Sequence, residues 1–391
     1  MLNGPFSPWP SFTQEEAEAV QQVLLSNRVN YWTGNEAREF ECEFAGFAGT
    51  DYAVAVANGT VALDLALKGM GIGPGDEVIV TSRTFLASAS CIVTAGATPV
   101  FADVDRDSQN ITPASVRACI TKRTRAVICV HLAGWPCEME GINALAREHG
   151  LFVIEDCAQA HGALYQGRPV GGWGDVGCFS FCQDKIMTTA GEGGMVTTND
   201  EALWSRMWSY KDHGKSYDAV YNRDHPPGFR WLHESFGTNW RMTEIQATVG
   251  RIQLQRMPQW HNQRLANCAA IWNTARQCPG LRVPKVPEHI EHAGYKCYLF
   301  VEPQALAPGW DRDAVQQAIM ARGVPCMSGS CSEVYREKNF QDANLAPSSP
   351  LPVASELGNT SLMLLCHPTL TDEEIEKTCS VIREVMGEAA A

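Results

Sequence analysis

Lys185 is the residue of this sequence with the most evident chemistry, because it follows an apolar run. Residues 176–181 form that run, and Gly191-Glu192-Gly193-Gly194 comes shortly after the lysine. A lysine that leaves a buried strand lies inside the protein, where removal from water favours the neutral amine that attacks an aldehyde. The glycines would form a tight turn that returns the next strand beside the lysine. The alternative is a structural lysine whose ammonium group reaches the rim.

Asp156 follows the apolar segment 151–154, and Gln159 comes three positions later. An aspartate that ends a strand of a parallel sheet lies at the edge where ligands gather. A carboxylate there can keep a pyridine nitrogen protonated, which makes the ring an electron sink, as pyridoxal phosphate requires of its protein. Such an aspartate can also be only a cap or a turn residue.

Asn58-Gly59-Thr60 follows the predicted strand 52–57 and precedes the helical pattern of residues 61–68. Free backbone amides and the helix dipole favour an anion at such a helix N-terminus, and Gly59 allows a close approach. The segment therefore predicts a phosphate site, with an ordinary N-cap as the alternative.

The elements that would position these residues follow an α/β rhythm. Amphipathic stretches alternate with short apolar runs at residues 52–57, 77–80, 99–104, 126–130, 151–154, 176–181 and 195–198. This alternation predicts crossover helices on a largely parallel sheet. The rhythm changes after a helix over 243–256. We therefore expect a large domain over residues 1–260 and a smaller C-terminal domain over 261–391. Within the smaller domain we expect a strand at 298–301, helices at 312–322 and 372–385, and a loop at 328–351.

Composition limits the kinds of partner and the cellular compartment. The chain of 391 residues has a net charge of −13 and no Lys/Arg-rich run, which argues against nucleic acid and anionic lipid as partners. Its 15 cysteines show no spacing that suits zinc, so no metal site is expected, and an odd count of scattered cysteines indicates reduced thiols. No apolar run approaches a membrane span. The expected location is the cytoplasm.

The order and separation of these segments resemble the sugar aminotransferases of the DegT/StrS type. The resemblance extends from residue 32 to residue 368, and its most specific parts are ANGT (57–60), GPGDEV (73–78), EDCAQAHG (155–162), GEGG (191–194) and NWRMTEIQA (239–247). It implies the aspartate aminotransferase fold, a three-layer α/β/α arrangement with a mostly parallel mixed sheet and a smaller C-terminal α+β domain. It also implies pyridoxal 5′-phosphate as the cofactor and a homodimer with shared active sites.

The resemblance also implies a role for each matching residue. Lys185 would carry the cofactor as a Schiff base and move the proton, and Asp156 would pair with the pyridine nitrogen. The remaining cofactor contacts would be Gln159 to the ring hydroxyl, Phe85 stacked on the ring, Gly59, Thr60 and Ser180 around the phosphate, and Asn239 reaching the phosphate from the neighbouring subunit.

The implied reaction moves an amino group from glutamate or glutamine to a keto-sugar. The acceptor would be a nucleotide-linked keto-hexose or a keto sugar acid such as an oxidised octulosonate, in the synthesis of surface polysaccharide, lipopolysaccharide or secondary metabolites. A keto-inositol aminotransferase, a sugar dehydratase and a non-catalytic regulatory protein remain alternatives, although a dehydratase would have a histidine in place of Lys185. Residues 325–331 depart from the family's His-Tyr-Pro-type segment, so the substrate itself can differ from the usual one.

Overall fold

The computed structural model describes residues 5–391, which fold around a seven-stranded sheet with the order β1-β9-β8-β5-β4-β2-β3. β9 is antiparallel to both of its neighbours, and every other pairing in this sheet is parallel. The predicted mostly parallel mixed sheet is therefore confirmed. The strands are β1 Tyr52–Val56, β2 Glu77–Thr81, β3 Thr98–Ala102, β4 Thr124–Val130, β5 Phe152–Asp156, β8 Val176–Ser180 and β9 Gly194–Thr198.

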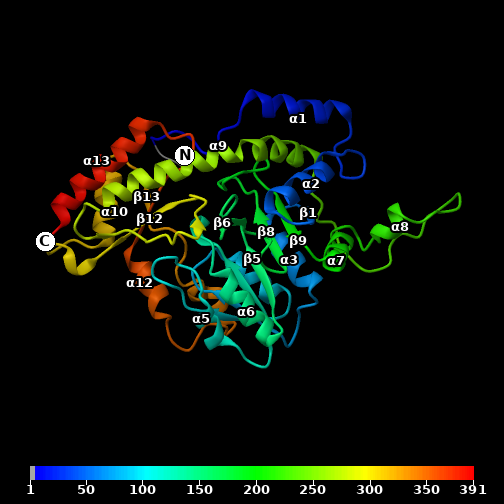
Figure 1. The fold of residues 1–391 in the computed structure, drawn as a ribbon, viewed down its shortest axis with the longest axis horizontal. Helices are drawn as coiled ribbons and strands as arrows, with labels where there is room; N and C mark the ends of the chain where they lie inside the picture. Colours follow the sequence, from blue (N-terminus) through cyan, green and yellow to red (C-terminus); the bar gives the residue numbers. More distant parts are fainter. Residues whose placement is uncertain (1–4) are drawn as a thin grey trace.

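Helices cover both faces of this sheet, which gives three layers (Figure 1). In β2, Val78 and Val80 pack into the hydrophobic core on one face and Ile79 packs into the core on the other. A strand that is buried on both faces reads as a continuous apolar run, as these strands do. One layer contains α3 Gly59–Gly69, α4 Ala87–Thr94 and α7 Glu201–Lys211, and the other contains α2 Glu36–Ala48, α5 Pro113–Cys119 and α6 Met139–His149.

The helix predicted over 243–256 is much longer than expected. α9 covers Glu244–Ala275 and contains Pro258. The prediction that it ends at residue 256 is wrong. The helix continues through Pro258 because side-chain packing outweighs the single backbone hydrogen bond that a proline removes. Met257 lies in the core of the large domain, whereas Ile271 lies in the core of the second sheet. The predicted boundary near residue 260 thus falls inside a continuous helix and stays a prediction.

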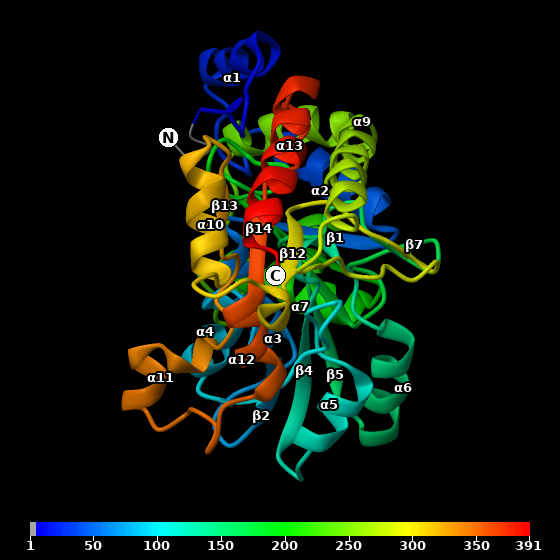
Figure 2. The same ribbon diagram turned by 90° about the vertical axis from the view of Figure 1, so that its left-hand side faces the viewer.

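A second, four-stranded sheet has the order β10-β12-β14-β13 and is entirely antiparallel. It contains β10 Leu281–Arg282, β12 Cys297–Val301, β13 Cys326–Met327 and β14 Ser361–Leu364. The C-terminal half of α9 shares its core with α10 Arg312–Ala321 and α13 Asp372–Ala389, and Figure 2 shows these helices beside the sheet. The predicted strand and both predicted helices of this region are confirmed.

The segment 328–351 is not the plain loop that its weak periodicity predicts. It contains the short helices η3 Val334–Arg336 and α11 Lys338–Asp342. Val334 and Phe340 pack into the core of the large sheet, and this packing stabilises the two short helices. Helices of three and five residues are too short to show a helical period in the sequence.

The remaining elements are short segments and helices outside the two sheets and layers described above. They are α1 Gln14–Ser26, η1 Leu132–Gly134, β6 Leu164–Tyr165, β7 Arg168–Pro169, α8 Tyr217–Tyr221, β11 Ile290–Glu291, η2 Pro303–Ala305 and α12 Pro352–Thr360. None of the helices between residues 5 and 391 is both long and apolar enough to cross a bilayer.

Candidate active site

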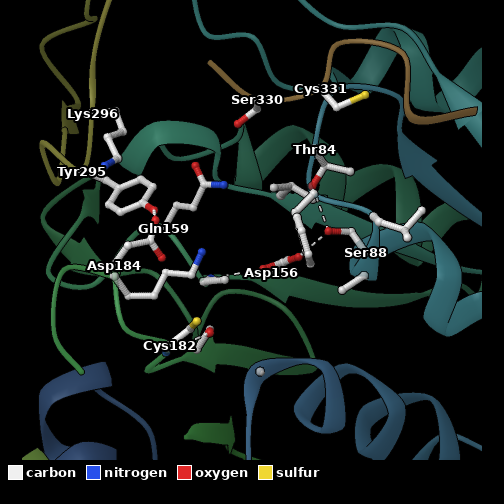
Figure 3. A pocket seen from close by; sticks show the side chains of 18 of the residues that line it. Thr84, Ser88, Asp156, Gln159, Cys182, Asp184, Tyr295, Lys296, Ser330 and Cys331 are labelled. Atoms are coloured by element: carbon white, nitrogen blue, oxygen red, sulfur yellow. Dashed lines mark hydrogen bonds between the residues drawn. The ribbon is translucent and has the colours of Figure 1, made fainter. Parts of the chain in front are cut away.

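A cavity of about 1090 Å³ lies where β5 and β8 end, and the smaller domain supplies its other wall (Figure 3). Seven of the eight predicted site residues line it: Gly59, Thr60, Phe85, Asp156, Gln159, Ser180 and Lys185. These residues come from four separate parts of the sequence. The fold therefore brings into one cavity four segments that the sequence marked separately as candidate site segments.

Asp156 is held in a fixed orientation by donors on two sides. Its Oδ2 accepts a hydrogen bond of 2.7 Å from the Ser88 hydroxyl, and its Oδ1 accepts one of 3.1 Å from the backbone amide of Ala158. The Ser88 and Thr84 hydroxyl oxygens are 2.8 Å apart. Since a hydroxyl has one hydrogen and that of Ser88 points to Asp156, Thr84 donates to Ser88. The sequence analysis missed Ser88 and Thr84, because no motif signals a hydroxyl placed 68 positions before its partner.

Lys185 lies in the segment between β8 and β9, and a hydrogen bond from a distant side chain holds its backbone in place. Its carbonyl oxygen accepts a hydrogen bond of 2.8 Å from the Trp9 indole nitrogen. Next to it, Asp184 accepts a hydrogen bond of 2.7 Å from the Tyr295 hydroxyl. Burial alone would raise the pKa of Asp184, but Lys185, the Tyr295 hydroxyl and Lys296 together lower it. A negative charge is thus kept beside the lysine.

The N-terminus of α3 offers free donors to an anion. Asn58 caps the helix by accepting a hydrogen bond of 2.9 Å from the Val61 amide. The amides of Gly59 and Thr60 have no hydrogen-bond partner within residues 5–391. Ser180 ends β8 directly opposite, and a Cβ atom on Gly59 would lie 2.5 Å from the Ser180 Cβ. The backbone and the serine therefore form a close cradle that suits a phosphate group.

Two further side chains suit a flat aromatic ring above Asp156. The Gln159 Oε1 accepts a hydrogen bond of 2.8 Å from the Ala133 amide, so its NH₂ group is left to donate. Phe85 is a cavity-lining phenylalanine that is 68% exposed. A lysine, a carboxylate, an amide donor, an open aromatic face and a phosphate cradle fit pyridoxal phosphate.

Gly59→Ala should weaken cofactor binding by about 10-fold or more, since overpacking costs about 1–3 kcal/mol. The added Cβ would push Ser180 away from the cradle. Titration of the apoprotein with pyridoxal phosphate, followed by absorbance, measures this effect. Gly46→Ala is the matched control, because a Cβ on Gly46 in α2 meets nothing within 4 Å. Equal affinities of the two variants would show that the cradle does not bind the phosphate.

Asn239 is the predicted site residue that lies apart from the others. It is exposed, forms a backbone bridge to Asp212, and does not line the cavity of its own chain. A contact between Asn239 and the cofactor would therefore have to come from a second subunit.

Comparison with known proteins also indicates an aminotransferase. The model of the DegT/DnrJ/EryC1/StrS aminotransferase family matches residues 10–383. The chain is 60% identical to an aminotransferase of known structure from Psychrobacter cryohalolentis, with a TM-score of 0.97 and coverage of 98% of this chain and 99% of that one. It is 44% identical to GDP-perosamine synthase of Escherichia coli O157:H7, with 96% of each chain covered.

A third relative is named UDP-N-acetyl-3-dehydro-α-D-glucosamine 3-aminotransferase and comes from Acidithiobacillus ferrooxidans. It is 39% identical, with 92% of this chain and 90% of the relative covered. The chain therefore belongs to the DegT/DnrJ/EryC1/StrS aminotransferase family and is a pyridoxal phosphate-dependent sugar aminotransferase.

Proposed function

We propose that this enzyme transfers an amino group from glutamate to the keto group of a nucleotide-linked hexose. The observation that carries the proposal is the meeting of Lys185 and Asp156 in one cavity that also contains a phosphate cradle. Glutamine stays open as the donor, and the products would be amino sugars for surface polysaccharide, lipopolysaccharide or secondary metabolites.

The residues of the cavity divide the chemical work. When bound, pyridoxal phosphate supplies an aldehyde and a protonated ring that withdraws electrons from the carbon next to the transferred nitrogen. In our proposal Lys185 would hold the cofactor through its side-chain amine, and that amine, when free, would accept and return the proton that the transfer moves. Asp156, oriented by Ser88, holds the proton on the ring nitrogen. Gly59 and Thr60 bind the phosphate.

Two observations favour a large, sugar-containing acceptor. The cavity of about 1090 Å³, which would hold pyridoxal phosphate together with the acceptor, lies at the upper end of the range of about 300–1,000 Å³ that is typical of small-molecule sites. Its wall in the smaller domain offers polar groups, because the Tyr298 hydroxyl accepts a hydrogen bond of 2.9 Å from the Ser330 amide and both residues line the cavity. The names of two relatives, with a GDP- and a UDP-linked sugar, support a nucleotide on the substrate.

We also propose that the active unit is a homodimer with shared sites. Asn239 lies outside its own cavity, and the segment that leads to it carries large exposed aromatic side chains: Phe229 at 77%, Trp231 at 83% and Phe236 at 98% exposure. Exposed apolar clusters of this kind mark association surfaces. A single-chain mass by sedimentation in the fully active enzyme would contradict this proposal.

A panel of acceptors tests the proposed substrate. The enzyme is first charged with nitrogen from ¹⁵N-glutamate, and it is then mixed with GDP-, UDP- and dTDP-linked keto-hexoses, a keto sugar acid and a keto-inositol. We expect mass spectrometry to find ¹⁵N in a nucleotide-linked amino sugar. Transfer only to the sugar acid or the inositol, or a product that has lost water without gaining nitrogen, would contradict the proposed acceptor or reaction.

A further inference from the structure

Lys296 is a second cavity-lining lysine, and the proposed function gives it no role. It directly precedes β12, and Figure 3 shows it beside Tyr295 on the same wall as Asp184. Its Nζ is 4.9 Å from the centre of the Tyr295 ring, and the Nζ of Lys185 is 5.4 Å from the same centre. The two nitrogen atoms therefore lie within about 10 Å of each other.

The ammonium group of Lys296 has no anion bound to it. Apart from the ring contact, no hydrogen bond or ion pair engages it within residues 5–391. Burial lowers the pKa of Lys296, and the nearby Asp184 opposes that shift. The Asp184 carboxylate, however, already accepts the Tyr295 hydroxyl hydrogen at 2.7 Å and also lies near Lys185. A cation in this setting favours a further anion from a ligand.

The surroundings of Lys296 increase the positive character of this wall. Arg264 is 1% exposed, and its Nε and Nη2 have no hydrogen-bond partner among the described residues. Burial, followed by the charges of Arg264 and Lys296, lowers the pKa of the cavity-lining His367 to about 3. His367 is therefore neutral at pH 7 and adds no further cation. Lys185 and Lys296 are the only lysine or arginine side chains that line the cavity in the described part of the chain.

We propose that Lys296 binds a carboxylate of the amino-acid donor. This inference rests on the proposed function, in which the donor amine takes the place of Lys185. The donor α-carbon then lies close to the Lys185 Nζ, with the α-carboxylate attached to it and the side-chain carboxyl carbon of glutamate about 4 Å away. The Lys296 Nζ, which lies within about 10 Å of the Lys185 Nζ, is the other lysine cation lining the space that these carboxylates enter. When the donor first enters, in our proposal, the Lys185 amine is still bonded to the cofactor, so Lys296 is the lysine of the cavity left to pair with a donor carboxylate.

The two half-reactions of the enzyme separate this role from a general loss of function. For Lys296→Met we expect the glutamate concentration that gives the half-maximal rate of amine loading to rise about 10- to 100-fold, the range of one charge-assisted hydrogen bond. Stopped-flow absorbance measures this step. The return step with the keto-sugar should keep its concentration dependence. Lys296→Arg should restore most of the donor affinity, and Lys285→Met removes an exposed lysine outside the cavity as the matched control.

A comparison of donors identifies which carboxylate is bound. If Lys296 binds the α-carboxylate, the variant should lose affinity for glutamate, glutamine and alanine alike. If it binds the side-chain carboxylate, only glutamate should suffer. Both results support the proposal. A loss confined to the keto-sugar step would assign Lys296 to the acceptor and overturn it, as would unchanged affinities or an equal effect of Lys285→Met.

Binding of glutarate provides a readout that does not depend on turnover. Glutarate has the two carboxylates of glutamate and no amine, so calorimetry on the cofactor-loaded protein reports only the anion site. Suppose that the wild-type enzyme aminates none of the nucleotide-linked sugars, but that Lys296→Met binds glutarate more weakly than the wild type does. The proposed acceptor would then be wrong, whereas the role of Lys296 in binding the donor would stand. Equal binding of glutarate to both proteins, with equal amine loading by glutamate, would overturn the role of Lys296.

Discussion

Lys185→Ala should leave a folded protein that transfers amino groups at least about 10²- to 10⁴-fold more slowly, the range that general acid/base catalysis provides. The variant loses both the amine that bonds to the cofactor and the base that moves the proton. Turnover with glutamate and a keto-sugar measures the loss, and circular dichroism checks the fold.

Lys185→Arg is the charge-matched companion of this variant. A guanidinium group keeps the positive charge beside Asp184 but stays protonated, so it cannot replace the amine. We expect it to be as inactive as the alanine variant. Lys285→Ala, which removes an exposed lysine elsewhere in the smaller domain, should keep normal turnover. If Lys185→Arg kept most of its activity, Lys185 would be needed only for its charge.

Asp156→Asn should keep the shape of the cavity and lose about 10²-fold or more in kcat, equivalent to about 3 kcal/mol of barrier. An amide cannot hold the proton on the ring nitrogen, so the electron sink weakens. Because Ser88 orients the carboxylate from 2.7 Å, Ser88→Ala should have a smaller effect in the same direction.

Cofactor titration and steady-state rates on the two variants distinguish a catalytic from a structural aspartate. Retained cofactor affinity with a large fall in kcat fits the electronic role. Near-normal turnover of Asp156→Asn would instead show that Asp156 only ends β5 and accepts the Ser88 and Ala158 donors.

The sequence predicted those parts of the molecule that depend on neighbours along the chain. Each predicted apolar run of the large domain is a strand, because a strand buried on both faces needs continuous apolar residues. The site residues at strand ends and helix starts follow from the same local logic, since the carboxyl ends of parallel strands meet at one edge.

The parts that the sequence did not predict depend on contacts between distant segments. Ser88 matters because folding places it on Asp156, and Lys296 because the smaller domain faces the Lys185 segment. The length of α9 beyond Pro258 and the short helices near Phe340 are likewise decided by packing into cores that no local pattern shows.

Borohydride reduction of the cofactor-loaded protein, followed by peptide mapping, tests the central claim most directly. It converts the bond between a lysine and pyridoxal phosphate into a stable label. We predict one labelled peptide, with the modification on Lys185. Lys296 lines the same cavity and so serves as an internal alternative. A label on Lys296 or on any other lysine, or no label when the cofactor is present, would contradict the account.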